Sequence, residues 1–231
     1  MRIVIAGAGS VGRTVALELL EHGHEVTLID NHPDQLRVAS VADAEWVLAD
    51  ACSPDALAEA GVPGADVLVA ATGDDKSNLV ISLLAKIEFA VPRVVARLNN
   101  PRNEWLFDGS WGVDVLVSTP KIMTALVEEA VSVGIPVRLF AFNSSEISMY
   151  ALTLPTDTAI AGRTVESLDL PAGVVLSALL RDGRPHSLQP QDSVEGGDEL
   201  LLLMPDEDHE ALAALTALVA PLVSSPSDGN L

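Results

Sequence analysis

Short apolar runs alternate with amphipathic stretches along the first half of the chain, at the lengths that strands and helices require. The apolar runs are rich in valine, isoleucine and leucine, which is typical of strands buried on both faces. The predicted strands are residues 2–6, 25–29, 46–49, 66–71, 92–98 and 113–117, separated by helical stretches at 13–20, 33–42, 54–60 and 76–88 and around Trp105. This alternation predicts an α/β fold with a Rossmann-like doubly wound parallel sheet.

An unusually apolar helix is predicted to end this first domain at residues 119–133. A helix of this kind at the edge of a finished sheet needs a surface to cover it. We expect a dimer contact, and packing against its own sheet is the alternative. The apolar side chains of this helix are Ile122, Met123, Leu126, Val127, Ala130 and Val131.

The second half of the chain joins its strands mainly by polar turn clusters, such as Arg181-Asp182-Gly183. Strands are predicted at 137–142, 148–154, 174–180 and 199–204, and helices at 162–168 and 206–219. This pattern predicts a second, smaller α+β domain. The expected organisation is therefore a Rossmann-like domain over 1–134, an α+β domain over 135–221, and a disordered tail over 222–231.

A glycine motif, Gly7-Ala8-Gly9-Ser10-Val11-Gly12, joins the first strand to the first helix. Gly7 permits the tight turn, Gly9 allows backbone to approach a phosphate, and Gly12 allows close packing of helix on strand. The free N–H groups at the start of the helix favour an anion. The motif predicts a phosphate site, although similar turns also close ordinary strand–helix joints.

The second predicted strand is followed by an acid, Asp30, at the place where nucleotide-binding folds hold a ribose. A carboxylate there accepts hydrogen bonds from both ribose hydroxyls and repels a 2′-phosphate. The glycine motif and Asp30 together favour adenosine or NAD-type ligands over NADP.

Composition narrows the class of protein further. The 13 basic and 33 acidic residues give a net charge of −20, which opposes a nucleic acid partner. Cys52 is the single cysteine, so an intrachain disulfide is excluded. No apolar run approaches the ~18 to 20 residues of a bilayer span, and residue 2 already opens a strand, without a secretory signal. We therefore expect a cytoplasmic protein.

An NAD-dependent oxidoreductase is the alternative, because the same motif can hold NAD for hydride transfer. Such an enzyme needs a placed acid or base beyond the nucleotide site. The candidates lie in a helix–strand turn, beside the ribose site or in the second domain, and we interpret them as surface or packing residues. They are His22 and His24 in the turn, His32 beside the ribose site, and His186, His209 and Tyr150 in the second domain. We predict no catalytic residue.

Metal chemistry also lacks a signal in the sequence. There is no Cys-x-x-Cys and no His-x-x-x-His pattern, so no metal site is predicted. The acidic run 206–208 is interpreted as a helix N-terminus, with cation binding as the alternative. Cys52 has no evident histidine partner and is interpreted as part of a pocket wall.

Short motifs occur in a fixed order along nearly the whole chain. In the first domain they are GAGSVG, Asp30, Ala49-Asp50-Ala51, Val69-Ala70-Ala71-Thr72-Gly73-Asp74-Asp75, Asn78-Leu79, Ala85-Lys86, Ala96-Arg97 and Asn99-Asn100-Pro101. In the second they are Ala161-Gly162-Arg163-Thr164, Leu168-Asp169-Leu170-Pro171, Arg181-Asp182-Gly183 and Gly197-Asp198-Glu199-Leu200. Together they resemble the TrkA-type RCK (KTN) regulatory proteins of potassium transport.

The resemblance implies a cytoplasmic regulatory subunit of a potassium uptake system. Its regulatory ligand would be NAD(H) or an adenine nucleotide, ADP or ATP. Its partner would be a membrane potassium-translocating subunit of the TrkH, TrkG or KtrB type, which attaches it peripherally to the inner face of the cell membrane. Homodimers would assemble into a higher ring, or into a hetero-oligomer with a paralogue.

The resemblance also implies the residues of the nucleotide site. They are Gly7, Ala8, Gly9, Ser10, Val11 and Gly12 at the phosphates, Asp30 and Asn31 at the ribose, Asp50, Ala51 and Cys52 at the adenine, Ala71, Thr72, Gly73 and Asp74 at the edge, and Arg97 at a phosphate. Arginine is a good bidentate phosphate donor, which favours Arg97 independently. A surface arginine paired with a carboxylate is the alternative.

Two positions depart from the pattern of the family. Ser10 stands where some ATP-sensing relatives carry an arginine, which weakens an ATP-specific interpretation. Lys76 stands where the family often has an acid, so no metal-bridging role is carried over to it.

Overall fold

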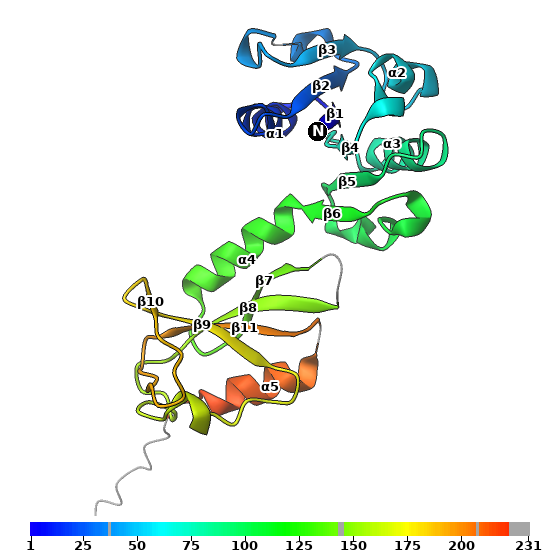
Figure 1. The fold of residues 1–231 in the computed structure, drawn as a ribbon. Helices are drawn as coiled ribbons and strands as arrows, with labels where there is room; N and C mark the ends of the chain where they lie inside the picture. Colours follow the sequence, from blue (N-terminus) through cyan, green and yellow to red (C-terminus); the bar gives the residue numbers. More distant parts are fainter. Residues whose placement is uncertain (37, 143–145, 207, 222–231) are drawn as a thin grey trace, which may run out of the picture. The chain divides into compact units, whose positions relative to one another are not determined.

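The computed structural model describes residues 1–36, 38–142, 146–206 and 208–221. The chain divides into two compact units, Met1–Lys121 and Ile122–Leu231 (Figure 1). The predicted division at residue 134 stays a prediction, and the predicted tail 222–231 lies outside the described residues. None of the described helices is long and apolar enough to span a bilayer.

The first unit is built on a six-stranded parallel sheet of order β3-β2-β1-β4-β5-β6. Its strands are β1 Arg2–Ala6, β2 Glu25–Asp30, β3 Glu45–Leu48, β4 Val67–Ala70, β5 Arg93–Leu98 and β6 Val115–Ser118. β1 pairs in parallel with β2 on one edge and with β4 on the other, so the strand order reverses beside it. This confirms the predicted Rossmann-like fold and places the reversal at the carboxyl end of β1.

Helices cover both faces of this sheet (Figure 1). α1 Ser10–Glu21 lies on one face, where Ile5 and Leu28 are buried, and α2 Pro54–Glu59 and α3 Asp75–Ile87 lie on the other, where Val4 and Leu68 are buried. Short 3-10 segments complete the connections: η3 Val62–Gly64, η4 Pro101–Leu106 and η5 Gly109–Trp111. The alternation of buried side chains along β1 therefore serves two separate cores.

The predicted helix over residues 33–42 is wrong. The structure has two 3-10 segments there, η1 Pro33–Gln35 and η2 Val38–Ser40, with residue 37 outside the described part. Pro33 starts a helical turn as expected, but residues 33–36 are exposed or half-buried. The segment buries too little apolar surface to stabilise a longer helix.

The α1 face of the sheet carries an apolar groove of about 810 Å³ within the first unit. α1 packs beside β1 and β2, while valines of β4, β5 and β6 line the groove. Its apolar lining includes Val11 and Val15 of α1 and Val67, Val69, Val95 and Val117 of the strands.

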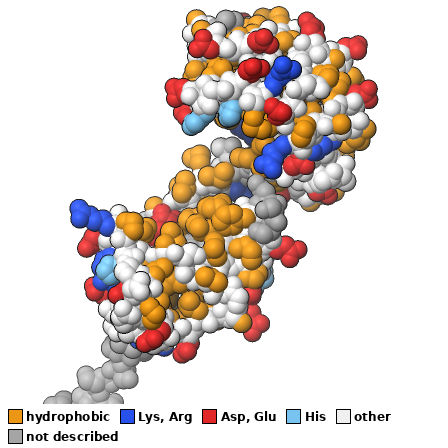
Figure 2. All heavy atoms as spheres, viewed as in Figure 1, with side chains coloured by type: hydrophobic (Ala, Val, Ile, Leu, Met, Phe, Trp, Pro, Cys, Tyr) orange, Lys and Arg blue, Asp and Glu red, His pale blue; other side chains and the backbone are white. Residues whose placement is uncertain are grey.

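α4, Thr119–Val131, follows β6 and confirms the predicted apolar helix. Only Ala125 of this helix is buried, whereas the side chains of Met123 and Leu126 are 64% and 57% exposed. Figure 2 shows hydrophobic side chains gathered over α4 and over strands of the second unit. The exposed apolar residues of the helix and its continuation are Ile122, Met123, Leu126, Val127, Val131, Val133 and Ile135.

The second unit is an antiparallel sheet of order β10-β9-β11-β8-β7 with α5 on one face (Figure 1). Its elements are β7 Val137–Ala141, β8 Ile147–Thr153, β9 Val175–Arg181, β10 Arg184–His186, β11 Glu199–Pro205 and α5 His209–Leu218. Alternate residues of β11, such as Leu200 and Leu202, are buried under α5 with Leu215. This confirms the predicted smaller α+β unit.

Two details of the second unit differ from the sequence prediction. The predicted helix over 162–168 is only the 3-10 turn η6 Val165–Ser167, and β10 was not predicted. The three residues of β10 are all exposed, so no apolar alternation marks this strand.

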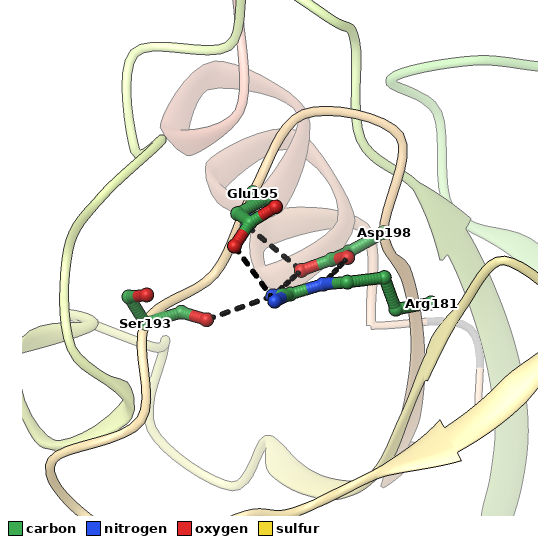
Figure 3. A network of polar contacts seen from close by, with 4 residues as sticks. All are labelled: Arg181, Ser193, Glu195 and Asp198. Atoms are coloured by element: carbon green, nitrogen blue, oxygen red, sulfur yellow. Dashed lines mark hydrogen bonds and ion pairs between the residues drawn. The ribbon is translucent and has the colours of Figure 1, made fainter.

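One buried carboxylate, Asp198, joins β9, β11 and the turn between them in the second unit (Figure 3). Arg181 donates to both of its oxygens, at 2.7 and 2.8 Å, and also to Glu195 and to the carbonyl of Ser193. Burial opposes ionisation of Asp198, but hydrogen bonds from Arg181 and the Glu195 N–H outweigh it, so its pKa is lowered. The network fixes the turn that leads into β11.

Candidate functional site

The glycine motif forms a tight turn between β1 and α1. Gly7 has φ of +105°, and a Cβ there would lie 2.8 Å from backbone atoms of Ala71 and Thr72. A Cβ on Gly12 would lie 1.9 Å from the carbonyl oxygen of Gly7. Both positions therefore require glycine for reasons of backbone packing, as the sequence predicted.

Gly9 leaves the start of α1 open. It is the N-cap residue of α1 and provides no side-chain hydrogen bond, and a Cβ at this position would meet nothing within 4 Å. The first N–H groups of a helix have no partner within the helix. Together with the positive end of the helix dipole, these N–H groups favour an anion next to Gly9 and Ser10.

Asp30 fixes the glycine turn to the end of β2. Its carboxylate accepts hydrogen bonds from the N–H of Ala8 at 2.8 Å and from the N–H of His32 at 2.9 Å. The imidazole Nδ1 of His32 lies 3.3 Å from the same carboxylate. A carboxylate has about four acceptor positions, so lone pairs of Asp30 stay available for ribose hydroxyls.

The residues after β3 form a second wall of the space at the strand ends, next to the wall made by the glycine turn and Asp30. Asp50 accepts a hydrogen bond from the N–H of Cys52, which holds this turn in place. Burial raises the pKa of the Cys52 thiol, so it is protonated at neutral pH. A protonated thiol is a poor nucleophile, which agrees with Cys52 as part of a pocket wall.

The loop after β4 forms a third wall. Asp74 caps α3 by accepting hydrogen bonds from the side chain and the N–H of Ser77, and these bonds lower the pKa of Asp74. Thr72 is held by the fully buried Asn78, which accepts from the Thr72 N–H and hydroxyl at 2.9 and 2.6 Å. The polar rim of the loop is thus fixed from behind by α3.

Arg97, near the end of β5, lines this space and also the apolar groove. Its Nε atom is buried and has no hydrogen-bond partner within the described part of the chain. A buried cationic donor without a partner is costly, and an anionic oxygen satisfies it. This favours the predicted phosphate contact over the alternative of a surface arginine paired with a carboxylate.

These walls enclose a cavity of about 540 Å³ at the carboxyl ends of the strands. It brings together all predicted site residues except three: Ala8 binds Asp30 through its N–H, Val11 lines the apolar groove, and Gly12 packs on Gly7. The predicted residues that line it are Gly7, Gly9, Ser10, Asp30, Asn31, Asp50, Ala51, Cys52, Ala71, Thr72, Gly73, Asp74 and Arg97. Their roles in ligand binding stay predictions.

His32, predicted beside the ribose site, also lines the cavity. The lining residues that were not predicted are Ile29, Gln35, Ser77 and Ile81. Ser77 and Ile81 follow Asp74 at helical spacing of three and seven residues, so the face of α3 that begins at a cap could have indicated them. Gln35 could not be found this way, because it lies in the 3-10 segment that was predicted as part of a longer helix.

The acid–base groups that line this cavity are Asp30, Asp50 and Asp74, together with Cys52 and His32. His32 is the histidine among its lining residues, whereas Tyr150 lies in the core of the second unit. Within the described residues, no group of three or more His, Cys, Asp or Glu side chains is arranged to hold a metal ion. The aspartates, the Thr72 hydroxyl and Arg97 of the lining offer hydrogen bonds to hydroxyls and phosphates.

The parallel sheet, the glycine turn and the acid after β2 define a Rossmann-type protein with a nucleotide-type cavity. Family models for the TrkA-N domain and the TrkA-C domain match residues 3–119 and 149–217. A Trk system potassium uptake protein TrkA of Mycobacterium tuberculosis is 49% identical over 215 residues, which are 93% of this chain and 98% of that protein. The chain belongs to the TrkA family of potassium uptake proteins.

Some relatives are longer. The Trk system potassium uptake protein TrkA of Vibrio alginolyticus is 31% identical over 212 residues, which cover 88% of this chain but 46% of that protein. Among solved structures, the GsuK channel bound to NAD matches 97% of this chain and 40% of its own, with a TM-score of 0.67 and 17% identity. The GsuK RCK domain matches 96% of this chain and 48% of its own, with a TM-score of 0.64 and 17% identity. These two structures show that both units share the RCK fold.

Proposed function

We propose that this protein is a cytoplasmic regulatory subunit of a potassium uptake system that binds NAD(H) or an adenine nucleotide, ADP or ATP. The cavity at the strand ends carries this proposal. It is lined by Asp30, by the open start of α1 and by Arg97, whose Nε has no hydrogen-bond partner among the described residues, and its volume suits a nucleotide. The names of the TrkA relatives and of the NAD-bound GsuK channel support it.

The proposed partner is a membrane potassium-translocating subunit, which attaches the protein to the inner face of the cell membrane. Nucleotide occupancy regulates that partner if the ligand binds two arrangements of the assembly with different affinity. No chemical step is needed for this. The two-unit RCK architecture supports a role of this kind.

An NAD-dependent oxidoreductase is the second candidate, and His32 at the cavity is the observation in its favour. The imidazole lies 3.3 Å from Asp30, at the proposed ribose end and not at a hydride acceptor. Incubation of the purified protein with NADH and a panel of carbonyl metabolites distinguishes the two candidates. The regulatory subunit consumes no NADH, whereas metabolite-dependent consumption of NADH would support the enzyme.

Binding itself is measured by titration calorimetry of NADH, ADP, ATP and NADPH into the purified protein. We expect NADH or an adenine nucleotide to bind with a dissociation constant in the micromolar range, as for typical regulatory ligands, and NADPH to bind more weakly because its 2′-phosphate meets Asp30. If none of the four ligands binds, the proposed function is rejected.

Asp30→Ala is expected to weaken binding of NADH by at least about tenfold, since it removes the ribose acceptor and the bond that holds the Ala8 N–H. The same calorimetric titration measures this change. Asp34→Ala is the matched control, because Asp34 is an exposed acid in η1 and does not line the cavity. Equal affinities of Asp30→Ala and the wild-type protein would refute the ribose assignment.

We further propose that α4 forms a contact between two copies of this chain, with higher assembly built from such dimers. The exposed apolar side chains lie at helical spacing on one side of α4, and Glu128 lies on the other side. The apolar groove of the first unit is a surface of matching character for such a helix from a second copy. In a symmetric homodimer the contact between α4 and the groove of the other copy occurs twice, once for each copy of α4.

The double substitution Met123→Gln and Leu126→Gln is expected to raise the dimer dissociation constant by at least about 100-fold, because each change removes apolar burial twice in a symmetric dimer. Sedimentation equilibrium measures this constant. Glu128→Gln, which places the same amide on the opposite side of α4, should leave it unchanged. A dimer of undiminished strength in the double variant would exclude α4 as the contact.

A further inference from the structure

A second buried carboxylate, Asp75, lies in the first turn of α3, behind the cavity and not among its lining residues. Its oxygens accept four hydrogen bonds from the segment after β5. Asn99 donates through its N–H at 2.7 Å and its side chain at 3.0 Å, Asn100 through its N–H at 3.0 Å, and Asn103 through its side chain at 2.8 Å. We call Asp75, Asn99, Asn100 and Asn103 the Asp75 cluster.

The charge of Asp75 is stabilised by these donors alone, since no ion pair to it occurs among the described residues. Burial opposes ionisation, but the hydrogen bonds from Asn99, Asn103 and Asn100 outweigh it, and the pKa of Asp75 is lowered. A buried carboxylate with four donors is rigid, because displacing any donor leaves charge unsatisfied. The segment after β5 must therefore follow the start of α3 if α3 moves.

On one side the Asp75 cluster touches the cavity wall. The carbonyl oxygen of Thr72 accepts hydrogen bonds from the side chains of Asn99 and Asn78, at 3.1 and 3.2 Å. The Asn78 amide also donates to the carbonyl oxygen of Arg97 at 2.8 Å. A ligand that contacts Thr72 therefore acts on a residue one hydrogen bond from the cluster. Arg97 is linked to Thr72 through the Asn78 amide.

On the other side the cluster leads to the start of α4, still within the first unit. Asn100 caps η4 by accepting from the N–H of Arg102, and Asn103 belongs to η4. Glu104 of η4 forms an ion pair with Lys121 in the first turn of α4. The Asp75 cluster fixes η4 itself. From η4 the connection reaches α4 through this exposed ion pair, which is weak alone.

We propose that Asp75 is the positioning residue that transmits nucleotide occupancy from the cavity to η4 and the first turn of α4. The inference rests on the proposed function, because it assumes that a nucleotide fills the cavity. The ligand pulls on Thr72 and Arg97, Asn78 and Asn99 carry the displacement to the cluster, and η4 responds because Asp75 holds Asn100 and Asn103. The coupling runs through contacts that all lie in the first unit.

The substitution Asp75→Asn tests the proposed coupling with almost no change in side-chain volume. An asparagine amide places an NH₂ group against donors that now face a carboxylate oxygen, so at least one side of the cluster opens. We measure hydrogen–deuterium exchange by mass spectrometry over residues 7–12, 72–74, 99–106 and 119–131. The measurement is made with and without saturating NADH, and ADP replaces NADH if NADH does not bind. In the wild-type protein we expect the ligand to slow exchange about fivefold or more in all four segments.

In Asp75→Asn we expect the ligand still to slow hydrogen exchange at 7–12 and 72–74 but no longer at 99–106 and 119–131. The affinity of this variant for the ligand should stay within about tenfold of wild type. Asn103→Ala removes one donor from outside the core, keeps the proposal testable if Asp75→Asn does not fold, and should reduce the response at 99–106. Asp108→Asn, which alters the exposed cap of the neighbouring η5, is the control and should respond like wild type.

Slowing at 99–106 that persists in Asp75→Asn or Asn103→Ala would overturn the coupling while leaving nucleotide binding intact. Slowing confined to 7–12 and 72–74 in the wild-type protein would also overturn it. Absence of slowing in all four segments of the wild-type protein with NADH, ADP or ATP would reject the proposed function, and the coupling with it.

Discussion

Gly12→Ala is expected to abolish nucleotide binding and to destabilise the first unit by at least about 3 kcal/mol. The added Cβ would lie 1.9 Å from the Gly7 carbonyl oxygen and 3.6 Å from the Ile5 side chain. Gly7 cannot yield, because its N–H binds the Ile29 carbonyl at 2.8 Å and its own environment is packed against residues 71 and 72. α1 must therefore move away from β1, which displaces the phosphate site.

Urea unfolding followed by tryptophan fluorescence measures this effect in the first unit alone, since that unit holds all three tryptophans, Trp46, Trp105 and Trp111. Gly9→Ala is the matched control for folding, because its Cβ has open space. We expect wild-type stability in Gly9→Ala but weaker binding, since the methyl group enters the phosphate site. A stable, ligand-binding Gly12→Ala protein would contradict the packing argument.

Asp198→Ala is expected to destabilise the second unit by about 3 kcal/mol, because it leaves the Arg181 guanidinium without its main partner in a partly buried place. The Glu195 N–H also loses its acceptor. The helical and strand signal in circular dichroism should then show an early transition in urea, while the tryptophan transition of the first unit stays in place. If both the circular dichroism and the tryptophan transitions of Asp198→Ala stay at the urea concentrations of the wild-type protein, the network contributes little to stability.

Asp169→Ala provides the control for Asp198→Ala. Asp169 also pairs with an arginine, Arg163, at 3.5 Å, but its side chain is 93% exposed. Such a pair contributes within about 0.5 kcal/mol. A large loss in Asp169→Ala would mean that burial does not distinguish the two pairs.

The same carboxylate predicts a pH dependence of the second unit. The pKa of Asp198 is lower in the folded chain than in the unfolded chain, so ionised Asp198 stabilises the fold above the ordinary aspartate pKa of about 4. This contribution is lost as the pH falls through the folded-state pKa. Wild-type stability should therefore fall more steeply below about pH 5 than that of Asp198→Ala.

The parallel sheet was predictable because its strands are covered on both faces and read as unbroken apolar runs, as in residues 67–70. Residues 33–42 and 162–168 were not, because short polar segments take their form from the surfaces they cover and not from their own periodicity. β10 is three exposed residues that pair with β9, and only the neighbouring strand specifies it.

The cavity was largely predictable because parallel strands end at one edge and the motifs follow those ends. Val11 lines the apolar groove and not the cavity, because it lies one residue beyond Ser10 on a helix and its side chain is turned about 100° away. The cluster around Asp75 depends on side chains 24 to 28 residues away in the sequence, and no local pattern reveals such contacts.

The position of β1 in the centre of its sheet also governs how the chain folds during synthesis. The ribosome releases β1 first, and β2 soon covers one of its edges, but the other edge has no partner until residues 67–70 of β4 have been made. An unpaired apolar strand is prone to aggregation during this interval. The second unit instead begins with neighbouring strands, β7 and β8, that pair antiparallel. We therefore expect translation speed over the first 70 residues to affect the yield of folded protein more than speed over the remainder.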